Sequence, residues 1–64
     1  MQRTIRGLRN DLGLTQKEMA EKLGVPIASY QRYERYQQVP TAKMLIKLAD
    51  LCGILDLREI KYEN

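Results

Sequence analysis

Residues 14–34, LTQKEMAEKLGVPIASYQRYE, predict two short helices separated by very few residues. Thr15 followed three residues later by Glu18 has the spacing of a capping box, which marks the start of a helix. Gly24 is expected to end that helix, because glycine is favoured just past a helix C-terminus. A new helical pattern then begins almost at once, so the chain must turn sharply between the two helices.

The second of these helices is predicted to start at Pro26 and to run to about Arg35. Proline fits the first helical position, where its missing N–H costs nothing. Tyr30 and Tyr33 repeat at a spacing of three, and we predict that they pack in the core and do not serve as stacking platforms for bases. A tight turn containing glycine makes two helices cross steeply, as in a helix-turn-helix. In that motif the first helix crosses a DNA backbone and the second enters the major groove.

The rest of the chain predicts three further short helices and no strand. Apolar residues at positions 5, 8 and 12 mark a first helix that ends at Gly13. Residues 41–52 are apolar nearly all round, with a polar stripe of Lys43, Lys47 and Asp50, so this helix should be the buried centre. Asp56 and Glu59 are spaced as caps of a fifth helix that holds Leu57 and Ile60. The predicted fold is all-α, five short helices in one domain, residues 1–64.

Length and composition exclude several classes of protein. A chain of 64 residues buries only about 60% of its unfolded surface, so a deep catalytic cleft is not expected. The sequence has no His, and Cys52 is its single cysteine, set among apolar residues as a buried thiol would be. We therefore expect no disulfide, no metal, no cofactor and no enzyme activity. No segment has the apolar length of a membrane span, and no signal peptide is recognisable.

Charge is distributed unevenly along the chain. Residues 1–47 hold nine Lys and Arg against four Asp and Glu, a net charge of +5. Residues 48–64 hold two basic and four acidic side chains, a net charge of −2. A basic part of this kind favours an anionic partner, although a solvated surface has the same composition. Arg3 and Arg6 fit both interpretations, as phosphate contacts or as solvated charges.

Several segments together resemble a known family. Arg9 and 13-GLTQKEMAEKLGV-25 match the pattern R-x-x-x-G-L-T-Q-x-E-x-A-x-x-L-G-V, and Tyr33-Glu34, Pro40 and 44-MLIKLADLCGI-54 continue the match. This order and spacing is similar to the Cro and phage-repressor (Xre-type) helix-turn-helix family, over roughly residues 5–60. The resemblance implies the five-helix lambda-repressor-like domain. It also implies sequence-specific binding of double-stranded DNA by a small transcriptional regulator of phage or mobile-element type.

The resemblance also assigns roles to single residues. Gln16 matches a residue that binds a backbone phosphate, Lys43 falls near a segment that touches the backbone, and Glu34 matches a residue that pairs with the counterpart of Arg9. Three further residues, Ile27, Ala28 and Arg32, match positions that reach base edges in the family, and Gln31 lies on the same exposed side. The complete set of expected DNA contacts is Gln16, Lys17, Ile27, Ala28, Gln31, Arg32, Arg35, Tyr36 and Lys43.

Two positions depart from the family pattern. Pro26 stands where a Ser or Thr cap is usual, and Arg35-Tyr36 stands where Asn-Gly is usual. Glycine there permits a positive φ, which tyrosine adopts only at a cost, so the turn after the third helix is expected to differ. The Tyr36 side chain suits either a phosphate contact or a half-buried position.

Other functions and assemblies agree with the same sequence. An antitoxin of a toxin–antitoxin pair is one alternative, and a helical protein-interaction adaptor that has lost DNA binding is another. We expect a homodimer, formed in solution or only on DNA through the fifth helix around Leu57 and Ile60. The expected location is the cytoplasm of a bacterial or phage-infected cell, in association with the nucleoid.

Overall fold

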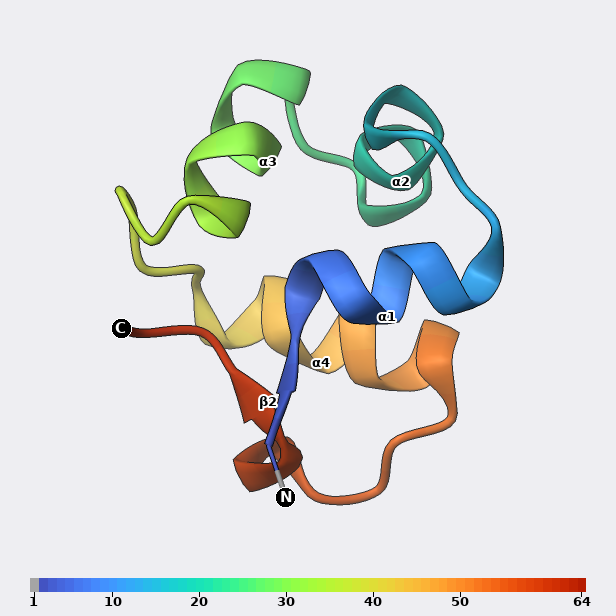
Figure 1. The fold of residues 1–64 in the computed structure, drawn as a ribbon, viewed down its shortest axis with the longest axis vertical. Coiled ribbons are helices and arrows are strands. Elements are labelled where there is room, and N and C mark those ends of the chain that lie inside the picture. Colours follow the sequence, from blue (N-terminus) through green and yellow to red (C-terminus); the bar gives the residue numbers. More distant parts are fainter. Residues whose placement is uncertain (1) are drawn as a thin grey trace.

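The computed structural model describes residues 2–64 and contains, within them, four α-helices and one pair of short strands (Figure 1). The helices are α1, Ile5–Leu12; α2, Gln16–Leu23; α3, Ile27–Glu34; and α4, Ala42–Cys52. Strand β1, Arg3–Thr4, pairs with β2, Ile60–Lys61, which follows a 3-10 turn, η1, at Leu57–Glu59. The predicted order of the first four helices is confirmed. None of the helices in the described range is long and apolar enough to cross a membrane.

Threonine side chains cap three of the four helices. Thr15 accepts a hydrogen bond from the backbone N–H of Glu18, whose carboxylate accepts from the N–H of Thr15 at 2.9 Å, so the predicted capping box is present. Thr4 and Thr41 each accept from the N–H three residues later. These bonds satisfy N–H groups that a helix start leaves without a partner, which fixes where the helices begin.

The core lies between α1, α2, α3 and α4. Tyr30 and Tyr33 are buried in it, as the spacing predicted. Ile60 from β2 also enters this core. The buried apolar residues are Ile5, Leu8, Met19, Ala20, Leu23, Tyr30, Tyr33, Met44, Leu45, Leu48, Ala49 and Ile60.

Helix α4 is not buried all round, contrary to the prediction. Met44 and Leu48 lie in the core, whereas Ile46 on another face is 52% exposed. The reason is the size of the chain: a domain this small has too few elements to cover every side of a helix. In Figure 1, α1 lies above α4 in the view, and only a loop and the short turn η1 lie below it.

The prediction of a fifth helix is wrong, and so is the prediction of no strand. Asp56 accepts from the N–H of Arg58 at 2.9 Å, and this starts only a three-residue 3-10 turn. The chain then becomes extended, and Ile60 pairs in parallel with Arg3. This pairing and the burial of the Ile60 side chain override the local helical signal, since tertiary contacts outweigh weak propensity. The side chain of Ile60 is buried within its own chain and is not exposed for the expected dimer contact, whereas Leu57 is partly exposed.

Candidate nucleic-acid interface

Helices α2 and α3 are joined by only Gly24, Val25 and Pro26. Gly24 has φ +70°, and the N–H groups of Gly24 and Val25 donate to carbonyls in the last turn of α2, which closes that helix. In Figure 1, α2 is seen nearly along its axis while α3 runs across the view. The two helices therefore cross steeply, as a helix-turn-helix requires.

Pro26 was predicted to be the first helical residue of α3, but it is the N-cap of this helix. Its ψ of 145° is extended, and no side chain caps the helix. The preference of proline for a φ near −65° suits this position as well, because Pro26 has φ −62°. Without a capping side chain, the first N–H groups of α3 have no side-chain acceptor.

Helix α3 turns one side to the core and the other outward. Ile27, Ala28 and Arg32 are exposed, and Ile27 keeps 44% of its surface accessible. Tyr30 and Tyr33 point the opposite way, into the core. Ala28 and Arg32 are one helical turn apart and share a face. This outward face holds the three residues that the family resemblance assigned to base edges.

A buried carboxylate, Glu34, ties α3 to α1 and α2. The Nε of Arg9 donates to Glu34 Oε2 at 2.7 Å, and Gln16 Nε2 donates to Glu34 Oε1 at 3.1 Å. The hydroxyl of Tyr30 also donates to Glu34. Arg6, on the same face of α1, has its Nε 3.6 Å from Glu34 Oε1. Three helices are therefore joined at one side chain, which sets the placement of α3 against α2.

The protonation state of this cluster is shifted by its surroundings. Burial by itself raises the pKa of Glu34, but the hydrogen bonds from Arg9, Tyr30 and Gln16 outweigh it and hold the pKa below its usual value. The bond to Glu34 raises the pKa of Arg9, and burial raises the pKa of Tyr30. Glu34 is thus ionised and Tyr30 neutral near pH 7, the states in which the hydrogen bonds hold.

Gln16 and Gln31 connect this cluster to the outer surface. Gln31 Nε2 donates to Gln16 Oε1 at 3.1 Å, while Gln16 Nε2 donates to Glu34. The orientation of the Gln16 amide is fixed by these two bonds, because its nitrogen must face a carboxylate and its oxygen a donor. Both glutamines are half-buried at the junction of α2 and α3.

The remaining expected contacts lie around this face. Lys17, Arg35 and Lys43 are exposed. Tyr36 is half-buried, with the ammonium of Lys61 5.8 Å from the centre of its ring. In the turn after α3, Tyr36 takes the left-handed conformation with φ 59°, the positive φ that a tyrosine was expected to adopt only at a cost. For Arg3 and Arg6 the sequence left two roles possible, a phosphate contact or a solvated charge. In the structure, Arg3 of β1 forms an ion pair with Asp11 of α1.

The sequence did not identify three features of this region. The Tyr30 hydroxyl and the Gln16 amide both bind Glu34, and no local pattern reports a contact between separate helices. Lys47 lines a hollow beside the α2–α3 turn together with Lys43. The sequence did indicate that Lys47 lies beside Lys43, because residues four apart on a helix are neighbours and both belong to the polar stripe of α4.

Comparison with known proteins decides the family. A helix-turn-helix family model matches residues 5–60. The chain belongs to the helix-turn-helix family, of the Cro and phage-repressor type that its motifs resembled. The cryptic phage CTXphi transcriptional repressor RstR from Vibrio cholerae serotype O1 (strain ATCC 39315 / El Tor Inaba N16961) is 38% identical over 46 residues. The matched segment covers 72% of the length of this chain but only 41% of the length of the relative. No solved structure matches the chain at a significant level.

Proposed function

We propose that this chain is a sequence-specific transcriptional repressor of phage or mobile-element type, which binds double-stranded DNA by placing α3 of a lambda-repressor-like domain in the major groove. The observation that carries this proposal is the outward face of α3, where Ile27, Ala28 and Arg32 are exposed together. The family match and the similarity to a phage repressor support it.

The residues on this face have the chemistry of base recognition. Ile27 and Ala28 are apolar side chains at an exposed helix start, where they suit contact with thymine methyl groups. Arg32 takes part in no ion pair within residues 2–64, so its guanidinium is available to guanine O6 and N7. These two kinds of contact together discriminate between base pairs.

Phosphate contacts position the recognition helix. Gln16 is the first residue of α2, where free N–H groups and the helix dipole favour an anion. The Gln16 amide retains one N–H after its bond to Glu34, and this hydrogen also suits a phosphate oxygen. Lys17, Arg35 and Lys43 supply exposed positive charge around the same surface.

The operator is expected to be two-fold, with one copy of the chain on each half-site. A single domain of this size contacts few base pairs, and two copies one helical turn of DNA apart gain both affinity and site length. The contact between copies does not involve Ile60, which is buried within its own chain.

Selection of bound sequences from a random duplex library tests the function. The expected result is a short two-fold motif whose binding weakens as salt rises, with a log–log slope of about −0.9 for each phosphate neutralised. Enrichment of no sequence, together with no duplex binding at low salt, would falsify the proposal and favour a protein-interaction adaptor.

A further inference from the structure

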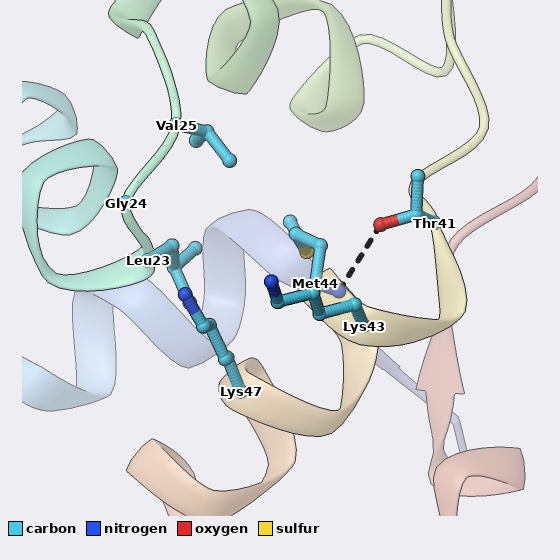
Figure 2. A pocket seen from close by; sticks show the side chains of 7 residues that line it. All are labelled: Leu23, Gly24, Val25, Thr41, Lys43, Met44 and Lys47. Atoms are coloured by element: carbon cyan, nitrogen blue, oxygen red, sulfur yellow. Dashed lines mark hydrogen bonds between the residues drawn. The ribbon is translucent and has the colours of Figure 1, made fainter.

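A hollow of about 150 Å³ lies between the α2–α3 turn and the start of α4 (Figure 2). The buried side chains of Leu23 and Met44 form part of its lining. Lys43 and Lys47 line it from α4, and Figure 2 shows both ammonium groups directed towards the turn. The hollow thus combines an apolar base with two positive charges at its mouth.

Gly24 allows the Lys47 ammonium to lie close to the backbone of the turn. A Cβ at Gly24 would stand 3.4 Å from Lys47 Nζ, so a larger side chain would compete for the same space. Neither Lys43 nor Lys47 has a carboxylate partner within residues 2–64. Both positive charges therefore face the hollow, and no acidic side chain of residues 2–64 neutralises them.

The position of these lysines is unfavourable for the free protein. They lie four residues apart on α4, where like charges repel each other. Lys43 also stands in the first turn of α4, at the positive end of the helix dipole, and this turn contains no acidic residue. The C-terminal end of α2 offsets part of this for Lys47, whose ammonium lies beside Gly24. An anion in the hollow would relieve all of these repulsions together.

We propose that this hollow binds a phosphate of the DNA backbone, with Lys43 and Lys47 as its ligands; the inference rests on the proposed function. Lys47 was not among the DNA contacts expected from the sequence. The α2–α3 turn forms the side of the hollow next to it. The phosphate lies at the C-terminal end of α2, whereas Gln16 marks the N-terminal end.

The separation of the two ends fits two phosphates that flank the recognition helix. Seven steps along α2, from Gln16 to Leu23, span about 10 Å at 1.5 Å per residue. The major groove is about 12 Å wide. A helix of this length therefore reaches from one side of the groove to the other. Gln16 contacts one strand, and the hollow holds a phosphate of the opposite strand.

Replacement of Lys47 tests this site. Lys47→Gln removes the charge at nearly constant length, Lys47→Arg retains it, and Lys22→Gln is the matched control, since Lys22 is an exposed lysine outside the hollow. Dissociation constants are measured against salt, on the selected operator and on a random duplex. Lys47→Gln should weaken binding to both duplexes by a similar factor and make the log–log slope shallower. Lys43→Gln combined with Lys47→Gln should reduce the slope by about 0.9 per protomer, the value for one phosphate. Lys47→Arg should keep the parental slope, and so should Lys22→Gln.

The outcomes separate this inference from the function on which it rests. If the parent binds no duplex, both proposals are overturned. If the parent binds but Lys47→Gln keeps the parental slope, or only matches Lys22→Gln, the phosphate site alone is overturned. Thermal melting of Lys47→Gln without DNA provides a second readout. A lower midpoint with an unchanged salt slope would assign Lys47 to helix stability, whereas a parental midpoint with a reduced slope supports the site.

Discussion

The side chain of Gln31 donates to Gln16 Oε1 at 3.1 Å, which joins the outer face of α3 to the start of α2. Because Gln16 also donates to Glu34, each glutamine restricts the other at the proposed interface. Gln31→Ala should weaken operator binding by about 0.5–1.5 kcal/mol, the net value of one hydrogen bond. In a Gln16→Ala background the same change should have little effect, since the partner is already absent. If the losses in binding free energy are additive in this double-mutant cycle, the two glutamines act independently.

The Arg9–Glu34 pair should dominate the stability of the domain. Arg9 Nε lies 2.7 Å from Glu34 Oε2, and the Glu34 side chain is fully buried. Removing one partner of a buried pair leaves an uncompensated charge and costs roughly 3–5 kcal/mol. Arg9→Ala and Glu34→Ala should therefore both melt far below the parent, with Arg58→Ala, on an exposed pair, as the control. If both variants melt at the same temperature as the parent, the ion pair contributes little to the stability of the domain.

Acid should destabilise the domain through Glu34. The folded-state pKa of this carboxyl lies below its ordinary value, because hydrogen bonds from Arg9, Tyr30 and Gln16 outweigh its burial. Its contribution is complete above the pKa of an unfolded glutamate and is lost as pH falls through the folded-state pKa. Urea unfolding of the parent and of Glu34→Gln from pH 7 to pH 3 measures this. The variant should be less stable at pH 7 and should lose less of its stability on acidification; parallel curves would assign the acid sensitivity to other groups.

Tyr36 provides a test of backbone strain. Its φ of 59° lies in the left-handed region, which costs a residue other than glycine about 1–2 kcal/mol. Tyr36→Gly removes this strain and Tyr36→Ala keeps it, while both remove the contact with Lys61. The glycine variant should exceed the alanine variant by about 1 kcal/mol in the free energy of unfolding. Equal stability of the two would show that the turn carries no strain.

Local signals in the sequence predict the four α-helices, although the same kind of signal at Asp56 and Glu59 predicts a fifth helix that does not form. Thr15 with Glu18 fixed the start of α2, and Gly13, Gly24 and Gly53 all follow a helix in the left-handed conformation, as C-terminal glycines do. The strand at Ile60 was not predictable in this way. Its conformation depends on pairing with Arg3, at the other end of the sequence. A short segment with weak propensity takes the structure that its distant partner imposes.

The exposure of the α3 residues was predictable from the sequence, whereas the contacts between helices were not. Ile27, Ala28 and Arg32 share an outward face that helical periodicity already implies. The bond between Gln16 and Gln31 depends on the crossing of α2 and α3, which no local pattern measures. The hollow at Lys47 likewise requires the α2–α3 turn to lie against α4.

Arg32 decides whether α3 reads sequence or only holds the DNA. It is exposed, lies one turn after Ala28 on the outer face, and has no ion-pair partner within residues 2–64. A bidentate contact of Arg with guanine contributes about 1–3 kcal/mol of discrimination. Arg32→Ala should therefore lose that much on the selected operator and much less on random DNA. A phosphate contact predicts a different pattern, with a uniform loss on all sequences and a shallower salt slope.

A series of operators with single base-pair substitutions separates these two roles of Arg32. If Arg32 reads a base, the parent discriminates at one position per half-site and Arg32→Ala is indifferent there, while preferences at the other positions remain. Arg35→Ala is the matched control, since Arg35 is an exposed arginine at the end of α3 and its removal should lower affinity without altering base preference. If Arg32→Ala weakens every member of the series equally, the guanidinium binds the backbone, and recognition rests on the remaining exposed residues of the outward face, Ile27 and Ala28.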